Sequence, residues 1–264
     1  MEPPQVMVWL LREGSEGILT WEPTDDRAGL ERGLAKAVQE GFGVAQLHRL
    51  SAKVDPSDAV GRRALHRQGF RLEGRLRGAV PHPDQTFGDA VLYARLADDT
   101  TQGRDGFTAV MNTVTPRKRL IAHALVTDAA GNVLLCATSF KPDWELPGGI
   151  VEPFESPVTG LRREMAEEMG WAPTVHGPLV VDWLRPYLGW EDAVELVFAT
   201  EPVAEAERGL ATPDGVEILA LHWVPPAVLD AHMTPFGAAR ARSALRALAE
   251  GTTLYTEGGE LLGP

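Results

Sequence analysis

The sequence predicts an α/β protein built from two units. Segments in which apolar residues alternate or run together, as in strands, are interspersed with segments whose apolar residues recur at helical spacing. Such mixing of strands and helices along one chain is typical of an α/β architecture. With 264 residues, 44% of them hydrophobic and 23% charged, the chain has a globular composition and is long enough for two modest domains or one large one.

A polar, non-periodic stretch at 98–106 divides the chain. It contains Gly103 and Gly106 and carries neither a strand pattern nor a helix pattern, so it is interpreted as a linker. The predicted domains are therefore residues 1–97 and residues 107–264.

In the first domain the apolar pattern predicts four strands and two helices. The strands are expected at 6–11, 17–21, 45–54 and 91–96, and the helices at 26–41 and 55–69. In the second domain, strands are expected at 119–128, 132–139, 178–184, 193–200 and 218–224. Helices are expected at 157–169 and 237–248, and a short helix is expected to begin at Pro225-Pro226.

Composition limits the compartment and the partners. A single cysteine, Cys136, excludes an internal disulfide framework and suits a reducing compartment. No apolar run approaches the roughly 20 residues that cross a membrane, so we expect a cytoplasmic protein without membrane contact. The net charge is −12, and residues 106–264 hold 21 acidic against 11 basic side chains. Such an acidic half argues against a nucleic-acid partner, because phosphate contacts need Lys and Arg.

The stretch 148–171, GGIVEPFESPVTGLRREMAEEMGW, contains a helix with well-defined ends. Ser156 is a favourable N-cap, Pro157 suits the first helical position, and Gly170 is a favourable stop. The apolar side chains recur at helical spacing and predict a stripe that packs on a sheet. They are Val158, Leu161, Met165 and Met169.

The same helix carries an acidic face. Glu164, Glu167 and Glu168 stand at i, i+3 and i+4, so their carboxylates are expected to converge beside a glycine loop. Like charges at this spacing destabilise a helix by a few tenths of a kcal/mol per pair, so something must offset the repulsion. Oxygen ligands without His or Cys select Mg²⁺ or Mn²⁺ over Zn²⁺. The pattern implies metal-assisted attack of water on phosphorus, and a merely solvated acidic face is the alternative.

This stretch resembles the Nudix family. The family signature is Gly, five residues, Glu, seven residues, Arg-Glu, an apolar residue, any residue, Glu-Glu, any residue, Gly and an apolar residue. The chain agrees at every fixed position. These are Gly149, Glu155, Arg163, Glu164, Met165, Glu167, Glu168, Gly170 and Trp171. The resemblance covers about residues 117–250 and implies an α/β/α sandwich.

The resemblance also implies an activity and roles for residues. Nudix proteins use Mg²⁺ or Mn²⁺ to cleave a nucleoside diphosphate linked to another moiety, such as a nucleoside triphosphate, an ADP-ribose-like compound or a dinucleotide. The implied metal ligands are Glu164, Glu167, Glu168 and the carbonyl of Gly149. Arg163 and Glu155 correspond to the pair that braces the loop against the helix, and these five side chains are the expected catalytic residues. Either Glu164 or an acid outside the signature is the implied base; the outside candidates are Glu191, Asp192 and Glu195.

The segment after the signature suggests how the substrate is held. Trp183, Tyr187 and Trp190 cluster in the sequence, and their rings are candidates to stack on a base. Pro186 resembles a feature of ADP-ribose-hydrolysing members, whereas Tyr187 resembles one of dinucleoside-polyphosphate members. These features do not identify the nucleotide.

Residues 47–96 resemble the C-terminal half of a GNAT-type acetyltransferase. The strand, helix, Gly69-Phe70 turn and Glu73-Gly74 follow that family's order, but Leu30 and Asp58 replace residues usual at the coenzyme A site. With only 97 residues before the linker, the region is interpreted as a truncated, degenerate module used for packing or for a possible homodimer. Two alternatives stay open: a bifunctional protein with an active N-acetyltransferase domain, and a non-catalytic nucleotide-binding regulator.

Overall fold

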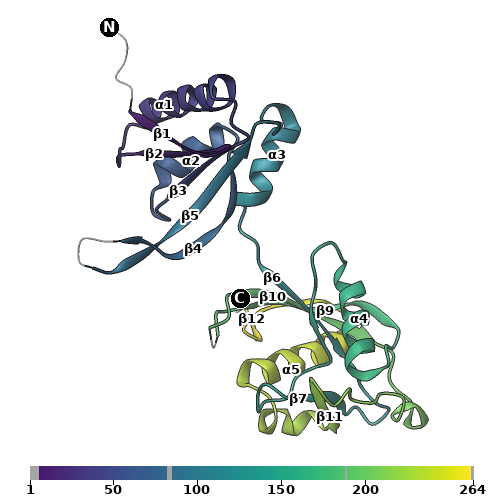
Figure 1. Ribbon diagram of the computed structural model, residues 1–264. Coiled ribbons are helices and arrows are strands. Elements are labelled where there is room, and N and C mark those ends of the chain that lie inside the picture. The colour runs from purple at the N-terminus through teal and green to yellow at the C-terminus, as the bar shows by residue number, and fades with distance from the viewer. Residues whose placement is uncertain (1–5, 82–84, 188, 263–264) are drawn as a thin grey trace. The chain divides into compact units, whose positions relative to one another are not determined.

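The computed structural model describes residues 6–81, 85–187 and 189–262 (Figure 1). The chain forms two compact units, Met1–Pro116 and Arg117–Pro264. The first unit extends beyond the stretch at 98–106 that we interpreted as a linker. Helix α3 (Gly103–Val114) begins inside that stretch and packs against a strand of the first unit, where the Thr113 hydroxyl accepts a hydrogen bond from the Leu72 amide at 3.0 Å. Among the described residues, no helix is long and apolar enough to cross a membrane.

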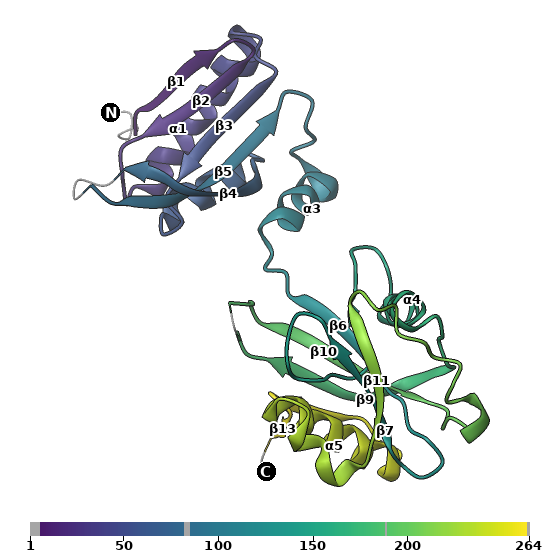
Figure 2. The ribbon, with the colours of Figure 1, turned by 60° about the horizontal axis from the view of Figure 1, so that its bottom comes forward.

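Besides α3, the first unit has a five-stranded sheet packed with two helices. The sheet order is β1-β2-β3-β5-β4, with only the β2–β3 neighbours parallel, and Figure 2 shows the sheet in front of α1. Side chains of both helices and of the central strands share one core, which includes Leu30, Leu50 and Leu65. The elements are β1 (Val8–Glu13), β2 (Glu16–Trp21), α1 (Arg27–Gln39), a π-helical turn η1 (Glu40–Val44), β3 (Arg49–Val54), α2 (Ala59–Arg67), β4 (Arg71–Pro81) and β5 (Phe87–Leu96).

The second unit has a six-stranded sheet in the order β13-β12-β9-β10-β6-β8 and a separate pair, β11-β7. Its strands are β6 (Arg119–Leu125), β7 (Val133–Thr138), β8 (Gly148–Ile150), β9 (Val175–Leu184), β10 (Ala193–Thr200), β11 (Ile218–Val224), β12 (Leu254–Glu257) and β13 (Glu260–Leu261). Its helices are α4 (Pro157–Met169), α5 (Pro235–Glu250) and the short turns η2 (Glu205–Glu207) and η3 (Pro226–Ala231).

Two cores lie on the two faces of this sheet. Along β10, Val197 joins the core under α5, whereas the next residue, Phe198, joins the core under α4. This alternation follows from the two-residue period of a strand. Figure 1 shows α4 and α5 on opposite sides of the sheet, so the unit is the expected α/β/α sandwich.

Candidate active site

Helix α4 begins and ends where its capping residues predict. The Ser156 hydroxyl accepts a hydrogen bond from the Thr159 amide at 3.2 Å, and Pro157 occupies the first turn. Gly170 ends the helix in the left-handed conformation with φ of 63°. These local contacts confirm the helix that the sequence predicted.

The apolar stripe of α4 fixes which side of the helix meets the sheet. Leu161, Met165 and Met169 are fully buried in the core beneath α4, and Val158 packs at its margin. The predicted stripe is therefore confirmed. Because this face is held against β6 and β10, the glutamates of α4 lie toward the loop that precedes the helix.

Glycines bring that loop into contact with the acidic side chains. A Cβ on Gly149 would lie 3.0 Å from the carboxyl carbon of Glu164, and one on Gly160 would lie 2.7 Å from Oε1 of Glu155. Gly148 has φ of 120°, and a Cβ there would lie 2.3 Å from the Ala122 carbonyl oxygen of β6. Close approach of backbone to carboxylate is thus the physical reason for glycine here.

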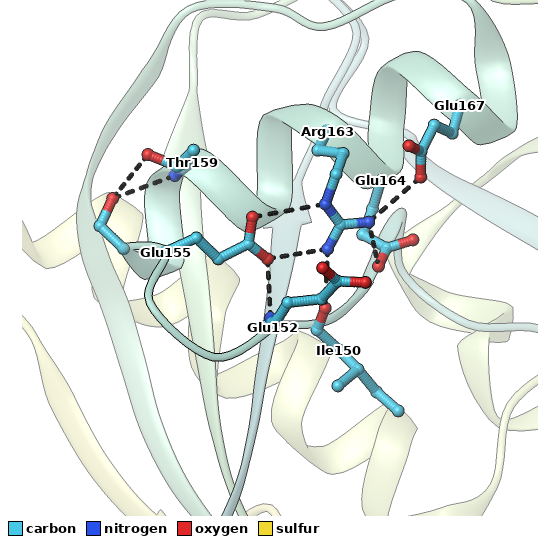
Figure 3. A network of polar contacts seen from close by, with 8 residues as sticks. Ile150, Glu152, Glu155, Thr159, Arg163, Glu164 and Glu167 are labelled. Carbon is cyan, nitrogen blue, oxygen red and sulfur yellow. Dashed lines mark hydrogen bonds and ion pairs between the residues drawn. The ribbon is translucent and has the colours of Figure 1, made fainter.

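Arg163 joins the loop to the acidic face (Figure 3). Its Nε and Nη2 atoms donate to the two oxygens of Glu155 at 3.3 and 2.8 Å, and Nη2 also reaches the Ile150 carbonyl at 3.2 Å. Its Nη1 atom donates to Glu164 and Glu167 at 2.9 and 3.1 Å. One guanidinium therefore hydrogen-bonds to three glutamates, and its hydrogen bonds to Glu155 hold the pKa of that carboxyl below the ordinary value.

The three candidate metal ligands differ in their surroundings. The Glu167 side chain is 62% exposed, whereas that of Glu164 is 19% exposed and Glu168 is buried. Burial raises the pKa of Glu164 and raises that of Glu168 to about 8. The Glu168 carboxylate accepts a long hydrogen bond from the Gly148 amide, at 3.4 Å. Glu168 therefore holds a proton near neutral pH more readily than an ordinary glutamate does.

The carboxylates are close to one another without forming a preformed cage. Across residues 6–81, 85–187 and 189–262, no three His, Cys, Asp or Glu side chains gather tightly enough to hold a metal ion. The contacts of Arg163 with Glu164 and Glu167 account for this, since they draw two of the three carboxylates toward the guanidinium. Convergence of the three glutamates on a metal stays a prediction.

Two further acids near this site were not predicted from the sequence. The charge of Glu145 contributes to the raised pKa of Glu168, and the charge of Glu217 contributes to that of Glu164. Glu145 precedes Gly148 by three residues, so its place in the sequence could have identified it as an acid near the glycine loop. Glu217 comes from the segment before β11, far along the chain, and nothing in its local sequence connects it to α4.

The three acids considered as outside bases lie in different places. Glu195 is 1% exposed, and its Oε1 lies 2.7 Å from Nδ1 of His123 and 2.6 Å from Nε of Arg240. Burial raises its pKa, but these two charges outweigh burial and hold the pKa below the ordinary value. Asp192 pairs with Lys118, whose hydrogen bond lowers the pKa of that carboxyl, and Glu191 is exposed.

Two of the three candidate stacking residues line one surface depression. This depression, about 620 Å³ in volume, is lined by Tyr187 and Trp190 together with Lys118 and Asp192. The Arg119 guanidinium lies 4.7 Å from the centre of the Trp190 ring. Trp183 is outside this lining, and its indole N–H points to Asp192 at 3.4 Å.

Comparison with known proteins identifies the family. The family model described as NUDIX domain matches residues 117–248. The chain belongs to the Nudix family. A Bacillus subtilis (strain 168) protein named "Putative 8-oxo-dGTP diphosphatase" is 32% identical to this Nudix chain over 114 residues, which are 43% of this chain and 71% of that protein. As a Nudix protein, the chain is a hydrolase that acts on phosphoric anhydrides.

Solved structures similar to this Nudix chain include members of two families. The MutT protein from Methanosarcina mazei Go1 is 22% identical with a TM-score of 0.42, covering 52% of this chain and 98% of that one. A GNAT-family acetyltransferase from Bacillus anthracis is 21% identical with a TM-score of 0.32, covering 35% of this chain and 58% of that one.

Proposed function

We propose that the chain is a Mg²⁺-dependent pyrophosphohydrolase that cleaves a nucleoside diphosphate linked to another moiety. The observation that carries this proposal is the geometry around Arg163. One guanidinium contacts Glu155 of the loop and Glu164 and Glu167 of α4, at distances of 2.8 to 3.3 Å. An intact brace beside a full set of acidic side chains is what turnover requires.

The residues fit a hard divalent cation. The proposed ligands are the carboxylates of Glu164, Glu167 and Glu168 and the carbonyl of Gly149, all oxygen donors, which suit Mg²⁺ or Mn²⁺. Glu168 is a buried carboxylate whose pKa is raised to about 8 by burial, so a nearby cation would favour its ionised form. When bound, such a cation neutralises phosphate charge and activates water.

The chain's own side chains have separate tasks in this proposal. Arg163 and Glu155 hold the loop that carries Gly149 at a fixed distance from α4. Glu167 is mostly exposed, so its carboxylate is free to leave Arg163 and bind the cation. Proton removal from the attacking water falls to Glu164 or to an acid outside the signature, and Glu145 and Glu217 now join the candidates because their charges act on the site.

Three substrate classes are proposed for testing: nucleoside triphosphates, ADP-ribose-like compounds and dinucleotides. The name of the Bacillus subtilis relative makes an oxidised deoxynucleoside triphosphate the first compound to test. The depression lined by Tyr187 and Trp190 supports a base-stacking role for these rings, with Lys118 near enough to attract phosphate. Trp183 is proposed to support the same segment.

A substrate screen tests the proposed function. The purified chain with Mg²⁺ is incubated with oxidised and ordinary deoxynucleoside triphosphates, ADP-ribose and dinucleoside polyphosphates, and released nucleoside monophosphate is measured by chromatography. The matched control is Glu168→Gln, which keeps the shape of the side chain and removes its charge. Hydrolysis of no compound with either Mg²⁺ or Mn²⁺ would overturn the proposal, and nucleotide binding without hydrolysis would favour the regulator alternative.

We further propose that the first unit does not bind acetyl-coenzyme A. Helix N-termini bind phosphate through free backbone amides. Here the carboxylates of Asp26 and Asp58 accept the amides of Gly29 and Gly61, at 2.8 and 2.7 Å. Helices α1 and α2 are thus each capped by an anion of the chain itself. This supports a packing or dimerisation role over the bifunctional alternative.

The wider setting is also a proposal. The single, buried Cys136 fits a reducing, cytoplasmic compartment, and the acidic second unit fits small-molecule nucleotides better than nucleic acid. Size-exclusion chromatography with light scattering would measure whether the chain is a homodimer.

A further inference from the structure

A stack of three aromatic rings lies next to the segment that leads into the proposed metal site. The indole of Trp144 is sandwiched between the imidazoles of His222, on β11, and His232, after η3. The ring centres are 3.9 and 4.1 Å from that of Trp144, and both interplanar angles are 5°. The Trp144 amide also donates to the His232 carbonyl at 2.7 Å.

From Trp144 to Gly148 the chain is held at successive residues. Glu145 exchanges two backbone hydrogen bonds with Cys136 of β7, at 2.8 and 3.1 Å, and Leu146 is buried. The Pro147 carbonyl accepts from the amide of Ala124 at 2.9 Å, and Gly148 then pairs with His123 of β6. Leu146 and the Trp144 ring both pack on the core beneath α5. Trp144 and the glycine loop thus belong to one continuous segment held by β6, β7 and the core beneath α5.

The glycine loop has little room for such a shift. A Cβ on Gly149 would already lie 3.0 Å from the Glu164 carboxyl carbon, and one on Gly148 would lie 2.3 Å from the carbonyl of Ala122. A misplacement of about 1 Å at a catalytic site costs on the order of a hundredfold in rate. Whatever fixes the start of this segment therefore influences the chemistry at its end.

We propose that His222 and His232 are positioning residues that clamp Trp144 and thereby hold the 145–149 segment in register with α4. The proposal rests on the proposed function for its kinetic consequence. Both imidazoles come from parts of the chain that follow the signature, more than 50 residues beyond Gly170. The flat faces of the two rings, rather than their ionisation, provide the clamp, since parallel aromatic rings attract one another.

Paired substitutions separate the clamp from a loss of folding. The double variant His222→Ala/His232→Ala removes both flanking rings, whereas His222→Phe/His232→Phe keeps flat rings of similar size. His176→Ala is the matched control, because His176, on β9, is an exposed histidine whose imidazole pairs with Glu201. Steady-state kinetics are measured on the substrate that the screen identifies, beside a thermal melt of each variant.

The alanine pair is expected to lower kcat about tenfold or more while KM changes by less than about threefold, as displacement of a catalytic loop predicts. The phenylalanine pair is expected to restore kcat to within about threefold of the parent, and the His176 control to match the parent. An alanine pair as active as the parent would overturn the clamp. A phenylalanine pair as slow as the alanine pair would overturn stacking as its basis.

Hydrogen exchange supplies a readout that does not depend on activity. The amides of Trp144 and Glu145 are expected to exchange faster in the alanine pair than in the parent, and at the parent's rate in the phenylalanine pair. Unchanged exchange in the alanine pair would overturn the clamp even if every variant lacked activity. If instead the parent hydrolyses nothing but exchange responds as expected, the proposed function fails and the clamp stands.

Discussion

Arg163→Lys is the most informative single change, because it keeps the positive charge and removes the planar, forked guanidinium. The guanidinium makes five hydrogen bonds, two to Glu155 and one each to Ile150, Glu164 and Glu167. These partners lie on both sides of a flat, forked group. A lysine ammonium is a single nitrogen with three donors, so it cannot reach the loop and both glutamates of α4 together.

The size of the effect follows from the bonds that are lost. Losing two or three hydrogen bonds worth about 0.5–1.5 kcal/mol each gives about 1–4.5 kcal/mol, and partial exposure puts the cost near the lower end, at about 1–2 kcal/mol. For a protein of this size such a loss lowers Tm by roughly 3–6 °C. The effect on turnover is larger, because a loop displaced by about 1 Å costs on the order of a hundredfold in rate.

Arg162→Lys is the matched control, since Arg162 is the neighbouring residue of the same helix and is exposed. Both variants are assayed for kcat and KM with Mg²⁺ and for thermal unfolding. We expect Arg163→Lys to lose kcat with little change in KM, and Arg162→Lys to match the parent in all three quantities. If the two variants behave alike, Arg163 is an ordinary surface residue and the brace argument is wrong.

Four further outcomes are expected. In metal-free protein, stability should fall as pH rises from about 4.5 to about 8, because burial raises the pKa of Glu168 from its ordinary 4.5 to about 8 and the folded state binds the extra proton. Glu168→Gln should reduce this slope in thermal melts across that range, and the raised pKa of Glu164 should leave part of it. Glu167→Gln should lower kcat by orders of magnitude but change stability by less than about 1 kcal/mol, because the ion pair is exposed; parental turnover would exclude Glu167 as a ligand. Gly160→Ala should lower kcat, because the new Cβ would lie 2.7 Å from Oε1 of Glu155 and displace that carboxylate. It should not lower Tm, because alanine stabilises a helix by about 1 kcal/mol relative to glycine. A variant with the kcat of the parent would show that the Glu155 carboxylate can move without consequence. Calorimetry should detect no acetyl-coenzyme A binding up to about a millimolar, and a micromolar isotherm would restore the bifunctional alternative.

Elements specified by neighbouring residues were predictable from the sequence. The ends of α4 follow from Ser156, Pro157 and Gly170, each of which acts within a few residues of itself. The strands expected at 193–200 and 218–224 have the bounds of β10 and β11, because runs rich in apolar residues mark them.

Elements that depend on distant partners were missed. The β4 segment is rich in Arg and Gly, and the weak alternation of its few apolar residues did not identify it as a strand; β5 pairs along its length. Likewise β12 is short and gains its structure from parallel pairing with β9, far away in the sequence. Helix α3 begins in a polar stretch that resembles a linker, and its buried residues are only Gly106 and Val110.

The site shows the same division. Pairing of Arg163 with Glu155 was expected from the family resemblance, and the structure contains it. Burial of Glu195 was not expected, because its partners His123 and Arg240 are brought to it by β6 and α5. A sequence shows that an acid is present, but whether it faces water or a buried arginine depends on the assembled sheet.

The repulsion among the α4 glutamates is resolved differently for each of them. Glu164 and Glu167 share the charge of Arg163, whereas Glu168 is buried and its raised pKa favours the neutral form. The metal-free helix is therefore stable without three bare charges on one face. A divalent cation that binds here must displace a proton from Glu168 and loosen the hold of Arg163 on Glu164 and Glu167. Cation affinity should consequently rise with pH up to about 8, whereas the bond between Arg163 and Glu155 has no reason to change. Under the proposed function, Arg163 holds the glutamates of α4 in the metal-free site and the loop in the metal-bound site, so we expect its shape to matter more than its charge.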